Sequence, residues 1–89
     1  MDKLIERYNF TLWATIVNQE GRSYQYMDAH GINILINEKT KEFSFEWCVP
    51  KSIFSIKCPT CSPYDKEEHF DKMYNKFLIL VLKVKKCLQ

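Results

Sequence analysis

The stretch Ile32–Cys48, INILINEKTKEFSFEWC, decides the fold of this chain. On both sides of the polar segment 38–41, large apolar residues alternate with mostly polar ones. An alternation of period two is typical of a strand that buries one face. A four-residue turn at 38–41 sets three apolar pairs opposite one another: Ile36 with Phe43, Ile34 with Phe45, and Ile32 with Trp47. The stretch therefore predicts an antiparallel hairpin with six large side chains on one face.

A second hairpin is predicted before this one. Residues 10–17 are rich in β-branched and aromatic side chains, and the turn-forming segment 18–21 ends at a glycine. The expected pairs are Val17 with Arg22, Thr15 with Tyr24, and Trp13 with Tyr26. This register places Trp13, Tyr24 and Tyr26 on one face. Residues 2–8 fit either a short helix or an extension of the first strand.

The C-terminal third predicts a helix that begins near Ser62 and Pro63. Ser62 suits a capping position, Pro63 the first helical position, and Asp65 the first turn. One apolar stripe recurs at four-three spacing: Phe70, Tyr74, Phe77, Val81, Val84 and Leu88. Acidic residues come early in this segment and lysines late, which suits the helix dipole. The alternative ends the helix near Asn75 and makes 77–84 a strand.

These elements predict an α+β fold for residues 1–89 as one domain. We expect an antiparallel sheet of about four strands with the C-terminal helix packed on one face. The stretch Ile53–Ile56 fits either a fifth strand or a connector. The expected core is Ile34, Ile36, Phe43, Phe45, Trp47, Phe70, Phe77 and Val81. Ile79 and Leu82 lie off the apolar stripe, so more apolar surface is offered than one small core uses, which indicates a partner or a homodimer.

Composition excludes several classes of protein. The chain has 89 residues, 46% of them hydrophobic and 27% charged, with a net charge of +2. It is therefore neither disordered nor strongly charged. The first residues are mixed in charge, and the longest apolar run, Phe77–Leu82, is far too short to span a bilayer. We expect a soluble cytoplasmic protein that does not bind membranes.

Cys58-Pro59-Thr60-Cys61 is the one short motif that could carry chemistry. Two thiolates at this spacing can hold one zinc ion, with Cys48 and His69 as the candidates for the remaining ligands. The motif also resembles the active-site tetrapeptide of glutaredoxin-type proteins, and that resemblance implies thiol redox chemistry. It covers four residues, and here the motif follows antiparallel hairpins instead of the first strand of a βαβ unit. The remaining interpretation is two reduced cysteines in a connector, with no cofactor.

The sequence offers no other set of catalytic groups. His30 and His69 have no evident nucleophile and orienting acid beside them, and two glycines do not make a phosphate loop. We therefore expect a non-enzymatic binding protein. Its expected role is a viral or mobile-element inhibitor that occludes a host protein such as a defence nuclease.

The expected partner-binding residues are aromatic anchors with charged neighbours. They are Trp13, Tyr24, Tyr26, Arg22, Glu42, Glu46, Lys83, Lys85 and Lys86. An alternative is a nucleic-acid-binding module, in which the sheet aromatics stack on bases and the basic C-terminal tail contacts phosphates.

Overall fold

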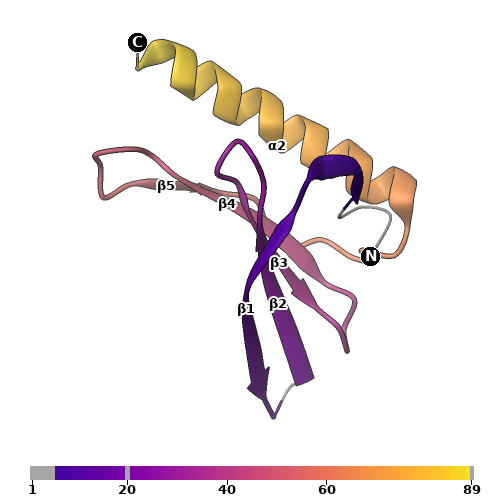
Figure 1. Cartoon of the computed structure of the whole chain (residues 1–89). Helices are drawn as coiled ribbons and strands as arrows, with labels where there is room; N and C mark the ends of the chain where they lie inside the picture. Colours follow the sequence, from indigo (N-terminus) through magenta and orange to yellow (C-terminus); the bar gives the residue numbers. More distant parts are fainter. Residues whose placement is uncertain (1–5, 20, 89) are drawn as a thin grey trace.

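A computed structural model describes residues 6–19 and 21–88 and shows an α+β fold. One sheet has five antiparallel strands in the order β1-β2-β3-β4-β5, and helix α2 lies across one of its faces (Figure 1). The elements are β1 Thr11–Asn18, β2 Gly21–Met27, β3 Asn33–Asn37, β4 Phe43–Cys48, β5 Ser55–Lys57 and α2 Glu67–Cys87. The prediction of about four strands was short by one, because Ser55–Lys57 pairs with the outer edge of β4.

The β3–β4 hairpin has the predicted register. Ile34 lies opposite Phe45 and Ile36 opposite Phe43, and the Asn37 N–H donates to the Glu42 carbonyl over 2.8 Å. The Asn37 side chain accepts hydrogen bonds from the N–H groups of Lys39 and Thr40. An asparagine side chain that binds backbone amides two and three residues ahead stabilises a turn locally. This local bonding fixes the loop length and therefore the face on which each strand residue lies.

The core lies between this hairpin and α2. Phe70 has its ring centroid 5.0 Å from that of Phe43 and 5.5 Å from that of Phe45. Ring pairs at these separations contribute roughly 0.5–1.5 kcal/mol each beyond their burial. All eight predicted core residues are buried, and so are Phe10, Tyr26, Ile32 and Tyr74. The helix prediction for 77–84 is confirmed, and the strand alternative is wrong.

Helix α2 begins five residues later than the predicted capping position. Its first residue is Glu67, and the Lys66 side chain makes no capping hydrogen bond. Cys61 forms an antiparallel bridge with Phe43, and the Tyr64 N–H donates to the Lys41 carbonyl over 2.9 Å. The backbone at 61–64 is thus held extended along the β3–β4 hairpin. These contacts override the local preference of Ser62 and Pro63 for a helix start.

The segment before β1 connects the sheet to the start of α2. Residues 6–8 are helical, and residues 2–5 of the predicted helix or strand extension lie outside the described ranges. The Tyr8 ring stacks on that of Phe10, with centroids 5.3 Å apart, and the Tyr8 hydroxyl donates to Asp71. Arg7 makes ion pairs of 2.5 Å with Asp71 and 2.6 Å with Glu67. This segment therefore closes the end of the core nearest the helix N-terminus.

A buried carboxylate ties the β2–β3 connection to α2. Asp28 is 6% exposed, and its Oδ1 accepts hydrogen bonds of 2.9 Å from the N–H groups of His30 and Ile32. Its other oxygen accepts a hydrogen bond from the Tyr74 hydroxyl. Burial and this carboxylate raise the pKa of Tyr74. Burial of a polar side chain costs free energy unless it is hydrogen-bonded in this way.

Within the described ranges, no helix has both the length and the apolar character needed to cross a bilayer.

We predict that the same substitution has very different effects at two isoleucines. Ile36 is 1% exposed and Ile53 is 96% exposed. Ile36→Val should lower the free energy of unfolding by about 0.5–1.5 kcal/mol, because it removes a buried methylene. Ile53→Val, the matched control, should change it by less than about 0.5 kcal/mol. Urea denaturation followed by circular dichroism measures both, and equal losses would contradict the observed burial.

We also predict that stability falls between about pH 10 and pH 12. Burial and the hydrogen bond to Asp71 raise the pKa of Tyr8 from 10.0 to about 12. The unfolded chain therefore releases the Tyr8 proton first, and the stabilisation present below pH 10 is lost as pH rises through the folded pKa. Urea midpoints across this range should fall less steeply for Tyr8→Phe than for the unmodified protein. Parallel slopes would contradict the contribution of Tyr8.

Candidate functional site

A β-bulge in β1 determines where Trp13 points. The β1–β2 register shifts between Leu12 and Ala14, so that Leu12 lies opposite Tyr26 and Ala14 opposite Gln25. Trp13 is the extra residue, and a bulge of this kind directs it to the same side as its neighbour Ala14. The predicted pairing of Trp13 with Tyr26 is therefore wrong, because regular alternation does not continue through residue 13.

The predicted aromatic trio is divided between the two faces of the sheet. Tyr24 lies opposite Ile36 and Tyr26 opposite Ile34, and directly paired residues share a face. Both tyrosines are therefore on the helix-covered side, where Tyr26 is 7% exposed and packs in the core. Tyr24 is half-buried, and its hydroxyl lies 3.3 Å from the Glu38 carboxylate. Tyr26 cannot be a partner-binding anchor, because the core already covers its ring.

Arg22 is on the same side of β2 as these tyrosines, two residues before Tyr24. It is exposed, because the tip of the β1–β2 hairpin projects beyond the helix (Figure 1). Arg22 is therefore separated from Trp13 by the sheet itself.

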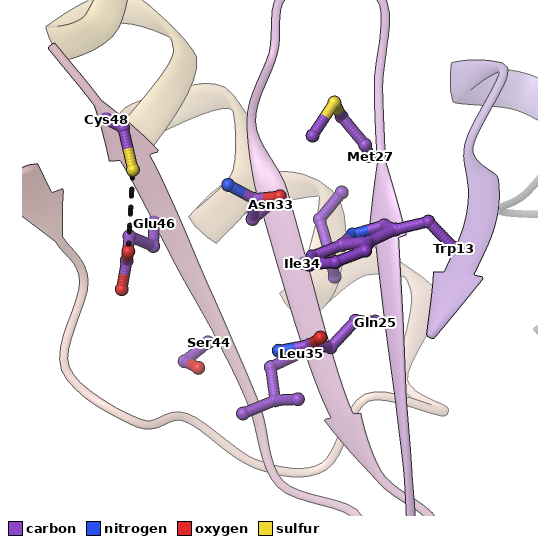
Figure 2. A pocket seen from close by; sticks show the side chains of 9 residues that line it. All are labelled: Trp13, Gln25, Met27, Asn33, Ile34, Leu35, Ser44, Glu46 and Cys48. Atoms are coloured by element: carbon purple, nitrogen blue, oxygen red, sulfur yellow. Dashed lines mark hydrogen bonds between the residues drawn. The ribbon is translucent and has the colours of Figure 1, made fainter. Parts of the chain in front are cut away.

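The face of the sheet opposite α2, here called the open face, carries a hollow of about 370 Å³. Figure 2 shows the Trp13 indole lying across β2 and β3 above this hollow. The hollow is lined by Trp13, Gln25, Met27, Asn33, Ile34, Leu35, Ser44, Glu46 and Cys48. Trp13 and Met27 also line an adjoining hollow of about 480 Å³ beside the β2–β3 connection. The indole is therefore a wall shared by two concave surfaces.

The open face is apolar at its centre and polar around it. Trp13 is 55% exposed, Met27 40% and Leu35 38%. Glu46 pairs with Lys57 over 3.5 Å, and the Cys48 thiol lies 3.7 Å from the Glu46 carboxylate. Both partners of this ion pair are well exposed to solvent, so it adds little stability. Asn33 Oδ1 is buried and has no hydrogen-bond partner among the described residues. Most buried side-chain polar atoms in proteins have at least one hydrogen-bond partner.

The other predicted charged residues do not converge on this hollow. Glu42 lines a smaller hollow that adjoins this one and shares Leu35 and Ser44 with it. Lys83 and Lys86 are exposed on α2, on the far side of the sheet. The Lys85 ammonium donates to the His30 carbonyl over 2.9 Å and lies 5.7 Å from the centre of the Trp47 ring. Of the predicted partner-binding residues, only Trp13 and Glu46 line this hollow, and Glu42 lies further along the same face.

Sequence reasoning missed Gln25, Met27, Asn33, Leu35 and Ser44 as lining residues. The alternation that identified the core also indicates these residues. Each of them lies next to an inward-facing residue on its strand and therefore faces the other side of the sheet. Leu35, an apolar residue at an outward-facing position, was the clearest indication.

The Cys-x-x-Cys segment shows two thiols packed beside β4. The thiols of Cys58 and Cys61 both lie near the Pro59 carbonyl, at 3.2 Å and 3.3 Å. Burial, with the neighbouring Cys61, raises the pKa of the Cys58 thiol from 9.0 to about 11. Reactive cysteines commonly have a lowered pKa, often at a helix N-terminus, and α2 begins only at Glu67, six residues after Cys61. The local electrostatics therefore oppose the redox alternative.

The four predicted zinc ligands are not brought together. Cys48 alternates with Trp47 and projects from the open face, whereas Cys58 packs against the core on the other face. The His69 ring packs edge-on against Phe43, with centroids 5.8 Å apart. Across residues 6–19 and 21–88, no three His, Cys, Asp or Glu side chains are grouped so that they could share a metal ion.

No family model, curated protein or solved structure matches this chain.

We predict that Cys58 is the slowest of the four cysteines to react with iodoacetamide at pH 8. Its raised pKa leaves very little thiolate at that pH, and thiolate is the reactive species. Cys48 and Cys87 are exposed and should be alkylated first. Mass spectrometry of timed digests gives the order. A fast-reacting Cys58 would contradict the structure and restore the redox alternative.

Proposed function

We propose that this chain is a non-enzymatic binding protein that covers the surface of another protein with its open face. The observation that carries this proposal is the position of Trp13. A bulge directs its indole over a concave apolar surface that no element of the described structure covers. A tryptophan in such a position buries a large area on binding at a small cost in side-chain entropy.

The composition of the open face supports a protein partner. Its centre is apolar, and amide, hydroxyl and carboxylate groups surround that centre. Protein interfaces commonly have this arrangement of an apolar core and a polar rim, with a few anchors carrying most of the binding energy. Glu46 and Lys57 nearly cancel each other's charge, so burial of Trp13, Met27 and Leu35 would drive association.

The mechanism that follows is steric occlusion. A rigid sheet face needs no chemistry to block a site on its partner; it must bind tightly and exclude the natural ligand. The partner that we propose is a host protein such as a defence nuclease, blocked by an inhibitor of viral or mobile-element origin. Support for this narrower part is the small size of the chain together with its exposed anchor.

The arrangement of the aromatic side chains does not favour the nucleic-acid alternative. It requires several aromatic rings on one accessible face. Tyr26 is in the core and Tyr24 lies on the opposite side from Trp13. A single exposed indole does not provide a base-stacking surface of that kind.

The test is capture of a partner with Trp13→Ala beside the unmodified protein. Each is immobilised and incubated with lysate of the native host, and bound proteins are identified by mass spectrometry. The purified partner is then titrated against both. Trp13→Ala should weaken binding by about 2 kcal/mol or more, roughly a 30-fold rise in Kd, because a hot-spot anchor is lost.

Val17→Ala is the matched control. Val17 is 68% exposed on the same strand but faces the helix side, so its loss should leave Kd unchanged. Melting curves of both variants should match that of the unmodified protein. Equal binding by Trp13→Ala and the unmodified protein would refute the open face as the binding surface, and so would unfolding of Trp13→Ala.

A further inference from the structure

Charge is segregated along this chain into two acid-free segments and an acidic remainder. Residues 47–64 and 72–89 contain seven of the thirteen basic residues and none of the eleven acidic ones. The rest of the chain holds six basic and eleven acidic residues, a net charge of −5. The total of +2 therefore hides a strong asymmetry between two parts of the molecule.

One part of each acid-free segment lies at the same end of the fold. The β4–β5 turn and the last turn of α2 project at the same end of the molecule (Figure 1). Between them is a cleft of about 530 Å³, lined by Pro50, Lys51, Lys85 and Leu88. We call this surface the lysine cleft. It lies at the far end of α2 from the Arg7 ion pairs, and it shares no lining residue with the open face.

The lysine cleft lies where the apolar stripe of α2 passes beyond the sheet and becomes exposed. Along this stripe Val81 is fully buried, Val84 is half-buried and Leu88 is 56% exposed. Leu88 occupies the next position of the same apolar stripe, where the sheet no longer covers the helix. An apolar side chain from a partner would complete the packing that α2 begins.

One of the two positive charges at the cleft is held in place by side-chain contacts, and the other lies in a hydrogen-bonded turn. The Lys85 ammonium is fixed by the His30 carbonyl and the Trp47 ring, and neither of these neutralises its charge. Lys51 lies in a turn closed by hydrogen bonds from the Val49 N–H to Phe54 O and from the Ser52 N–H to Val49 O. In the same turn the side chains of Ile53 and Phe54 are 96% and 71% exposed. A surface ordered before binding loses less entropy when a partner arrives.

We propose that the lysine cleft binds an acidic protein segment that carries a large apolar side chain between carboxylates. The apolar side chain packs against Leu88 and Pro50, and the carboxylates pair with Lys51 and Lys85. Phe54 covers the bound segment from the turn. This surface is additional to the open face and differs from it in charge.

The shape of the site favours a peptide segment over other anionic partners. A membrane surface is flat and would leave the cleft unfilled, whereas one extended chain can enter it. Lysines without arginines give charge attraction but not the planar, bidentate contacts that phosphates favour. A peptide with an apolar residue between acidic residues can contact Pro50 and Leu88 with the former and the two lysines with the latter.

The test is selection from a displayed library of random peptides, each of about twelve residues, against the complete chain. Selected peptides should carry Asp or Glu on both sides of Leu, Ile, Phe or Trp. They should bind Lys51→Glu and Phe54→Ser at least about tenfold more weakly than the unmodified protein, and added salt should weaken them further. Both substituted side chains are exposed, and circular dichroism confirms that each variant is folded.

Lys39→Glu is the matched control. It changes the net charge by the same amount as Lys51→Glu but lies in the exposed β3–β4 turn, so its peptide affinity should stay within about twofold. Selection of neutral or basic peptides, selection of none, or equal binding by Lys51→Glu would overturn the proposal. Phosphatidylserine vesicles and a single-stranded oligonucleotide are tested in parallel. If either binds in a Lys51- and Phe54-dependent manner and no acidic peptide does, the acidic-peptide assignment is wrong.

Discussion

The packing of two helix phenylalanines onto two strand phenylalanines is the constraint on which the rest of the fold depends. Phe70 contacts both Phe43 and Phe45, and the Phe77 ring centroid lies 5.7 Å from that of Phe45. These contacts fix α2 on one face of β3 and β4. Because side chains alternate along a strand, every residue between the core positions must then face away from the helix. The open face is thus a direct consequence of where these four rings meet.

A single helix packed on one face cannot cover all of a five-stranded sheet. Helix α2 crosses the sheet on one side, and the β1–β2 hairpin projects past it (Figure 1). This explains why Leu12 and Val17 remain 50% and 68% exposed although they are on the helix side. The same geometry leaves Tyr24 half-buried near the hairpin tip while Tyr26, closer to the helix, is in the core. Exposure in this protein therefore depends on distance from the helix as well as on the face of the sheet.

Predictions from the sequence succeeded where local patterns decide the structure. The β3–β4 register and the α2 stripe follow from alternation and helical spacing, and both are observed. The start of α2 was wrong because backbone bonds from Cys61 and Tyr64 to the β3–β4 hairpin outweigh the local signals. The predicted face shared by Trp13 and Tyr26 was wrong for two reasons: pairing with Ile34 in β3 puts Tyr26 on the helix side, and one inserted residue, Trp13, shifts the register of β1. In both cases the contacts that decide the structure join segments far enough apart that a local sequence pattern does not reveal them.

The site depends on that same inserted residue. Without the bulge, regular alternation would place residue 13 on the side of the sheet that α2 packs against, opposite Tyr26. With it, the indole lies on the open face between Met27 and Leu35, and this face gains a large anchor.

The two exposed surfaces differ in the force that would drive binding. Burial of the indole is largely independent of salt, whereas attraction to Lys51 and Lys85 is screened over about 10 Å at 0.1 M ionic strength. Added salt would therefore weaken binding at the proposed lysine cleft and leave binding at the proposed open face largely unchanged. Because the lysine cleft and the open face share no lining residue, each can be removed by substitution without altering the other.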